Sequence, residues 1–161
     1  MNRPIFFVTL LASIFVLAAS TPAPAKDNAL SLAQRDAAAM GRGDVAAALA
    51  LYSDDAVMQA GPLCNATPCV GKAAIQKNLE ARVAAKAHAT IIGKYVSGNV
   101  AAVQSEIRSD NTPKAGVERF IVWTIYEAKG DKIAAATGML QRTDPQTAKY
   151  LAWLQSQPPA R

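Results

Sequence analysis

The segment from His88 to Gln141 decides the fold class, and it reads HATIIGKYVSGNVAAVQSEIRSDNTPKAGVERFIVWTIYEAKGDKIAAATGMLQ. It is rich in β-branched and alternating residues, and turn signals at Ser97-Gly98-Asn99, Asp110-Asn111-Thr112-Pro113 and Lys129-Gly130-Asp131 divide it. Because short connections join the pieces, we expect an antiparallel meander. The predicted strands are His88–Val96, Val100–Ser109, Val117–Ala128 and Lys132–Gln141.

Three helical segments are expected before these strands. Apolar residues recur at helical spacing over residues 28–40, and Gly41-Arg42-Gly43 interrupts the pattern. Asp44 is a good N-cap and predicts a second, shorter helix that extends through Tyr52. Residues 72–86 continue in helical register without a breaker and predict the third helix.

The remaining segments are short. Ser53-Asp54-Asp55 is expected to end the second helix, residues 56–60 predict a short strand, and residues 147–155 predict a last helix. Helices followed by strands favour an α+β domain. We expect three N-terminal helices to pack on a curved antiparallel sheet in the shape of a cone. A cone that its side chains do not fill contains a pocket.

The N-terminus has the order of a secretory signal peptide. Arg3 precedes an apolar run from Ile5 to Ala19, and the small residues Ala23-Pro24-Ala25 follow. About 15 apolar residues at ~1.5 Å each span roughly 22 Å, less than the ~30 Å hydrocarbon core, so this run favours a cleaved signal over a membrane anchor. We expect a signal peptide at 1–25, a domain at 26–157, a disordered tail at 158–161, and a periplasmic or secreted protein without a membrane anchor after cleavage.

Charge and cysteine content exclude some functions. Loss of Arg3 with the signal leaves 16 of the 17 basic side chains against 12 acidic ones, spread without a basic stripe, so we expect no nucleic acid partner. Cys64 and Cys69 lie in a Pro- and Asn-containing loop, and in an oxidising compartment they are expected to form a disulfide. Two Cys and one His, His88, do not make four zinc ligands, so we expect no metal and no cofactor.

Several of these motifs together resemble one superfamily. The quoted features are Gly41-Arg42-Gly43-Asp44, then Leu49-Ala50-Leu51-Tyr52-Ser53-Asp54-Asp55-Ala56-Val57, then Gly71-Lys72-Ala73-Ala74-Ile75, and the turn at residues 130–133. This order over residues 30–141 resembles the nuclear transport factor 2-like superfamily, in its SnoaL-like and ketosteroid-isomerase-like branch. The resemblance implies the cone-shaped fold and says little about function, because proteins of this shape include enzymes and non-enzymes.

Ketosteroid isomerases use one catalytic carboxylate together with a Tyr and a neutral Asp that bind the oxyanion. Placed on this sequence through the shared motifs, the Tyr falls on Asp36, the catalytic carboxylate on Ala60 and the neutral Asp on Trp123. None of the roles is filled, so the resemblance does not carry that mechanism to this chain.

Strand alternation predicts which side chains face the interior. With Trp123 inward, the expected pocket residues are Met58, Ala60, Val103, Ser105, Ile107, Ile121, Trp123, Ile125, Ala136, Gly138 and Leu140. Such a wall suits a hydrophobic small molecule, and an ordinary packed core would use the same residues. The sequence therefore leaves two interpretations open, a ligand cavity and a packed core, and only the ligand cavity predicts a function.

Few polar groups remain for chemistry. His88 opens a strand near the pocket mouth of related proteins, where it would act as a general base in an isomerase, cyclase or hydrolase, with Asp36 as its orienting or independent partner. The alternatives are a structural histidine and a surface carboxylate. A non-catalytic interaction domain is a third possibility. The resemblance also implies a homodimer through the open sheet face, with Arg108, Glu118 and Tyr126 in or near it.

Overall fold

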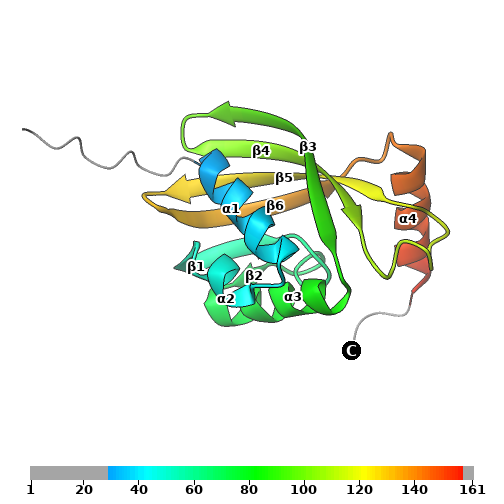
Figure 1. The fold of residues 1–161 in the computed structure, drawn as a ribbon, viewed down its shortest axis with the longest axis horizontal. Coiled ribbons are helices and arrows are strands. Elements are labelled where there is room, and N and C mark those ends of the chain that lie inside the picture. Colours follow the sequence, from blue (N-terminus) through cyan, green and yellow to red (C-terminus); the bar gives the residue numbers. More distant parts are fainter. Residues whose placement is uncertain (1–28, 158–161) are drawn as a thin grey trace, which may run out of the picture.

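The computed structural model describes residues 29–157 of the 161-residue chain (Figure 1). The expected signal peptide at 1–25 and tail at 158–161 lie outside the described residues. The described chain is a mixed α+β fold with one curved six-stranded sheet in the order β2-β1-β6-β5-β4-β3. The α+β expectation is therefore confirmed.

The four predicted strands are present and pair in sequence order. They are β3 (His88–Ser97), β4 (Val100–Arg108), β5 (Phe120–Lys129) and β6 (Lys132–Leu140). Each pairs antiparallel with the next, as the short connections predict. This part of the expected meander is confirmed.

The other edge of the sheet differs from the expectation. β1 (Tyr52–Gln59) pairs parallel with β6, and the two-residue β2 (Cys69–Val70) pairs antiparallel with β1. Parallel pairing is possible because all of β2 to β5, with a helix between, separates β1 from β6 along the chain. The sheet is therefore mixed at this edge rather than wholly antiparallel.

The second helix is shorter than its sequence pattern predicts. α2 (Val45–Leu49) ends before Tyr52, and Ser53-Asp54-Asp55 lies inside β1 instead of ending a helix. Pairing with β6 explains the change: Tyr52 lies opposite Ile133, and the Ile133 amide donates to the carbonyl of Leu51 at 2.8 Å. Tertiary pairing and burial of Tyr52 thus override the local helical pattern.

Helices cover one face of the sheet. α1 (Ala29–Gly41) crosses the sheet, and α3 (Lys72–Ala84) runs below it next to α2 (Figure 1). Leu32, Ile75 and Leu79 are fully buried between these layers. The core therefore lies on the concave side of the sheet, where the helices leave part of the space open.

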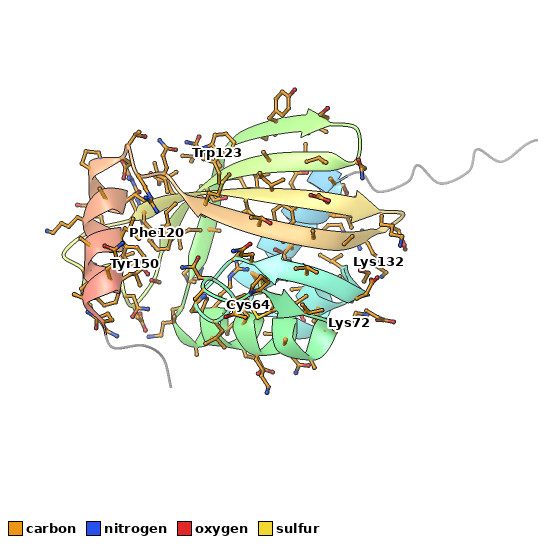
Figure 2. The ribbon with its side chains drawn as sticks, turned by 180° about the vertical axis from the view of Figure 1, so that it is seen from behind. Cys64, Lys72, Phe120, Trp123, Lys132 and Tyr150 are labelled. Atoms are coloured by element: carbon orange, nitrogen blue, oxygen red, sulfur yellow. A yellow bond between two sulfur atoms is a disulfide. The ribbon has the colours of Figure 1, made fainter. Side chains whose placement is uncertain are left out.

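The last helix lies beyond the ends of the strands. α4 (Pro145–Ser156) begins with Pro at its first turn, and the N-cap Asp144 accepts a hydrogen bond from the Thr147 amide at 2.8 Å. The Tyr150 ring stacks on Phe120 of β5 with centroids 4.1 Å apart, and both are labelled in Figure 2. α4 thus closes one end of the space between helices and sheet.

A disulfide joins Cys64 and Cys69, as expected. Asn78 of α3 is fully buried and ties the loop to the helix: it donates to the Ala60 carbonyl at 2.9 Å and accepts from the Leu63 amide at 3.0 Å. A side chain at Gly61 would collide with Asn78, and Gly61 also has φ of +86°. The loop is therefore held by a covalent bridge and by one amide side chain.

Among residues 29–157, no helix has the length and hydropathy needed to span a membrane. Within the same residues, no three His, Cys, Asp or Glu side chains gather in a group that could hold a metal ion.

Candidate functional site

A cavity of about 270 Å³ lies between the concave sheet face and the helices. Its wall is mostly apolar or small, with contributions from α1, α3, α4 and all the long strands. Eight of the residues expected in the pocket line it: Met58, Ala60, Val103, Ser105, Ile107, Ala136, Gly138 and Leu140. The interior of the cone is thus partly hollow and not a fully packed core.

The expected inward direction of Ile121, Trp123 and Ile125 is wrong. The residues of β5 that line the cavity are Phe120, Val122, Thr124 and Tyr126. Residues paired directly across an antiparallel ladder share a face, and Trp123 pairs with Gln104 whereas Val122 pairs with Ser105. Figure 2 views the sheet from the side opposite α1, and Trp123 lies on that outer face.

A β-bulge in β6 is the physical reason. Lys129 pairs with Lys132 and Ala128 with Ile133, but Glu127 then pairs with Ala135, so Ala134 is left over. A regular hairpin would have placed Ile125 opposite Ala136. The extra residue places Tyr126 there instead and reverses the faces of the β5 residues from Val122 to Glu127 relative to β6.

The innermost part of the cavity is polar. Asp36 of α1 is fully buried, and the Tyr126 hydroxyl donates a hydrogen bond to its Oδ2 atom at 3.1 Å. Among the described residues, Asp36 Oδ1 and the hydroxyl of the fully buried Tyr52 have no hydrogen-bond partner. All three side chains line the cavity. Asp36 is therefore not the surface carboxylate that one sequence interpretation assumed.

The electrostatics of this group follow from burial. Loss of water raises the pKa of the Asp36 carboxyl, although the Arg82 charge and the nearby Tyr126 and Tyr52 hydroxyls oppose the rise. Burial and the Asp36 charge raise the pKa of Tyr52 and of Tyr126 well above 10. Both tyrosines therefore keep their protons at neutral pH and can act as hydrogen-bond donors.

Arg82 adds a positive charge to the same region. It lies in the last turn of α3, is half-buried and lines the cavity. Its charge lowers the pKa of Asp36, Tyr52 and Tyr126, so it lies close enough to act on all three. The polar end thus contains one carboxyl, two phenols and one guanidinium.

His88 lines the cavity at its rim, in an exposed position. Its side chain is exposed, and its strand partner Arg108 belongs to the outer face, whereas Ala89 and Ile91 line the cavity from the inner face. No hydrogen bond among residues 29–157 joins His88 to Asp36. The two residues that the sequence analysis paired thus line the same cavity without a direct contact between their polar atoms in the described residues.

Sequence reasoning missed Tyr52, Tyr126 and Arg82. Tyr52 was assigned to a helix and Tyr126 to the outer sheet face, and Arg82 had no motif. One available signal concerns Asp36, because Leu32, Asp36 and Met40 share one face of α1 at intervals of four residues, and all three are buried. A carboxylate on the apolar face of a helix indicates a buried polar site.

Solved structures show the same architecture. An NTF2-like protein of unknown function from Cytophaga hutchinsonii is 12% identical, with a TM-score of 0.59 over 75% of this chain and 96% of that one. A putative polyketide cyclase from Sinorhizobium meliloti is 18% identical, with a TM-score of 0.58 over 67% and 93% of the two chains. A computationally designed 17-OHP binder is 17% identical, with a TM-score of 0.57 over 71% and 91%.

At sequence identities of 12–18%, the similarity to these three structures shows a shared fold only. No curated protein matches the sequence. The sequence pattern of the SnoaL-like domain matches residues 33–136, which cover most of α1, all of α2 and α3, and the sheet from β1 into the first half of β6. The chain belongs to the SnoaL-like domain family, with the NTF2-like fold.

Proposed function

We propose that this chain is an exported SnoaL-like domain that binds a small, largely apolar molecule in its cavity. The observation that carries the proposal is an apolar hollow whose inner end contains two unpartnered buried polar atoms, Asp36 Oδ1 and the Tyr52 hydroxyl. Natural ligand sites combine apolar walls with a few such polar groups. In a packed core, buried polar atoms without a partner would only cost stability.

Energetics favour an occupied cavity. Each buried polar atom without a partner costs about 1–3 kcal/mol. A ligand that supplies a hydrogen bond to Asp36 or Tyr52 removes part of this cost, and its apolar body gains about 25 cal/mol for each Å² that it removes from water. Water can satisfy the polar atoms, but it gains nothing from walls such as Val103, Ile107 and Leu140.

Two features support export. The N-terminal segment has the charged, apolar and small-residue order of a signal peptide. The Cys64–Cys69 disulfide is compatible with an oxidising compartment, the periplasm or the outside of the cell. Detection of the mature chain in a periplasmic fraction, with a new N-terminus near Lys26, tests this part of the proposal; an uncleaved chain in the cytosol contradicts it.

The enzymatic alternative with His88 as general base has less support. The exposed position of His88 at the rim leaves its imidazole in contact with water instead of a buried substrate. The structural relatives also include a designed small-molecule binder, so binding alone is a possible use of this architecture. Binding is therefore the function that the site supports best.

Binding can be tested by NMR titration of the mature protein with 2-methylnaphthalene, an apolar probe of two rings. We expect shifts at cavity residues such as Val122 and none on the outer face. The variant Val122→Phe fills the cavity and should abolish binding, whereas the matched variant Ile125→Phe on the outer face of β5 should not. Equal binding by both variants would contradict a site in the cavity.

A further inference from the structure

The inner end of the cavity offers two different hydrogen-bonding functions. The Tyr52 hydroxyl is a donor without an acceptor, and Asp36 Oδ1 is an acceptor without a donor, because Tyr126 donates to Oδ2 of the same carboxyl. Both residues are fully buried and line the cavity. The Tyr52 hydroxyl lies close enough to the carboxyl to lower the pKa of Asp36 as a hydrogen-bonding neighbour, but no hydrogen bond of regular geometry joins the two side chains, so both atoms can pair with a ligand.

This pair discriminates between ligand head groups. A carbonyl oxygen accepts from Tyr52 and leaves Asp36 Oδ1 without a partner. A charged carboxylate or ammonium must lose its water to enter this buried end, where the Asp36 and Arg82 charges already offset each other, so both charged head groups are disfavoured. A neutral hydroxyl donates through its hydrogen and accepts through its oxygen, and it therefore satisfies both atoms.

We propose that the bound molecule carries a neutral alcohol or phenol hydroxyl, which donates to Asp36 Oδ1 and accepts from the Tyr52 hydroxyl. This inference rests on the proposed function, because it names the head group of the molecule that the cavity binds. The cavity of about 270 Å³ lies just below the range of roughly 300–1,000 Å³ that is typical of drug-sized ligands. The apolar body is thus a compact scaffold of one or two rings.

Tyr126 has a positioning role in this arrangement. Its hydrogen bond of 3.1 Å fixes the Asp36 carboxyl and leaves Oδ1 free for the ligand. Tyr126 lies opposite Ala136, whose small side chain leaves space beside the phenol. The bulge in β6 is therefore what places the third polar side chain at this end of the cavity.

The test compares four probes that share one scaffold: 2-naphthol, 2-naphthaldehyde, 2-naphthoate and 2-methylnaphthalene. Affinities are measured by NMR titration of the mature protein at neutral pH. We expect 2-naphthol to bind about tenfold more tightly than 2-methylnaphthalene and more tightly than the aldehyde and the carboxylate. Equal affinities for 2-naphthol and 2-methylnaphthalene would overturn the hydroxyl inference and leave the proposed function standing.

Two variants assign the preference to its residues. Tyr52→Phe removes only the donor, so the preference for 2-naphthol should fall towards unity while the affinity for 2-methylnaphthalene stays within about twofold. Asp36→Asn replaces the acceptor with an amide that can donate, so the preference should move from 2-naphthol to 2-naphthaldehyde. The matched control Tyr95→Phe, with a side chain 69% exposed on β3, should change nothing.

The possible outcomes separate the two proposals. If none of the four probes binds the wild type, the cavity accepts no compact apolar molecule, and the proposed function fails together with this inference. If 2-naphthoate binds most tightly, the site is an anion site and the hydroxyl inference alone is wrong. If Tyr52→Phe keeps the full preference for 2-naphthol, Tyr52 does not contact the ligand. The wild-type probe series distinguishes the first two cases even if a variant fails to fold.

Discussion

The Tyr126 hydroxyl donates a hydrogen bond of 3.1 Å to Asp36 Oδ2 across 90 positions of sequence, and this contact joins the first helix to the centre of the sheet. Both residues are buried at the inner end of the cavity. A contact of this kind links packing to function, because it stabilises α1 against β5 and also orients the carboxyl that faces the cavity.

Removal of this hydrogen bond should destabilise the fold. In Tyr126→Phe the Asp36 Oδ2 atom loses the hydrogen bond that holds it, so we expect the free energy of unfolding to fall by about 1–3 kcal/mol. Urea denaturation measures the change. Tyr95→Phe is the matched control, since its exposed hydroxyl should contribute less than about 0.5 kcal/mol. Equal stability of the two variants would show that the contact does not form.

Asp36 predicts a pH dependence with a defined sign. Burial raises the pKa of Asp36 in the folded protein above its unfolded value of about 3.9. The folded state therefore holds the proton more tightly, and the associated stability is present below pH ~3.9 and lost as pH rises through the folded pKa. The Arg82 charge and the Tyr126 and Tyr52 hydroxyls act on the same carboxyl and reduce the shift.

The comparison with Asp36→Asn isolates this contribution. The amide cannot ionise and can still accept from Tyr126, so the wild type should lose stability relative to the variant as pH rises from 4 towards neutral. Urea denaturation of both proteins at several pH values gives the difference. A difference that stays constant with pH, or that changes in the opposite direction, would contradict the raised pKa.

Asp144 should stabilise the end of the cavity through α4. It caps the helix at the Thr147 amide and pairs with Arg119 at 2.6 Å, and the Arg119 hydrogen bond lowers its pKa to about 2. Asp144→Ala removes cap and pair together and should cost about 1–2 kcal/mol in urea denaturation. Asp144→Asn keeps a cap and should cost less.

The same carboxyl has the opposite pH dependence from Asp36. Its folded pKa lies below its unfolded value, so its stability contribution is present above pH ~3.9 and lost as pH falls through about 2. In Asp144→Ala the loss of stability between pH 4 and pH 2 should be smaller than in the wild type. An unchanged slope over this range would mean that the ion pair contributes nothing.

The disulfide should hold the loop that forms part of the cavity wall. Gly61, Pro62 and Asn65 line the cavity and lie in or beside the Cys64–Cys69 ring. In the double variant Cys64→Ala, Cys69→Ala we expect a loss of about 2–3 kcal/mol in unfolding free energy and weaker binding of 2-methylnaphthalene. Unchanged binding would show that the Asn78 hydrogen bonds alone position the loop.

The outer sheet face leads to a proposal about assembly. Met139 on this face is 51% exposed and lies next to the half-buried Trp123 and Ile125. Glu106 and Arg108 on the same face carry charges of opposite sign. A two-fold interface must be self-complementary. A patch that carries both positive and negative charges can pair with a second copy of itself. We propose that a second copy covers this face; Tyr126, which the sequence analysis placed near it, lies inside the cavity instead. Sedimentation of wild type and Met139→Arg should show a dimer and a monomer, and a monomeric wild type contradicts the proposal.

Sequence patterns predicted most of the fold. The turn signals at residues 97–99 and 129–131 mark the hairpins between the strands of the meander, and the apolar spacing predicted α1 and α3 within a few residues. These features are local, and local chemistry determines them. The shortened α2 was missed, because Tyr52 pairs with Ile133, a residue 81 positions later.

The site was predicted less well than the fold, for a specific reason. One extra residue in β6, Ala134, reverses the faces of most of β5. The run from Phe120 to Tyr126 has mainly apolar or aromatic residues at both alternations, and its polar Thr124 lies on the face that lines the cavity, so the pattern does not identify the buried face. The inward set on β4 and β6 was nevertheless right. Because of this one bulge, the apolar wall residues on β4 and β6 were predicted correctly, whereas Tyr126 on β5 was placed on the wrong face.

The most direct test of the account is an NMR measurement of nuclear Overhauser contacts between bound 2-naphthol and assigned side chains of the mature protein. We predict contacts from the ring protons to Val122, Leu140 and Tyr126 on the inner face, with the hydroxyl end nearest Tyr52 and Asp36. Contacts to Trp123 or Ile125 instead would place the ligand on the outer sheet face and contradict the account.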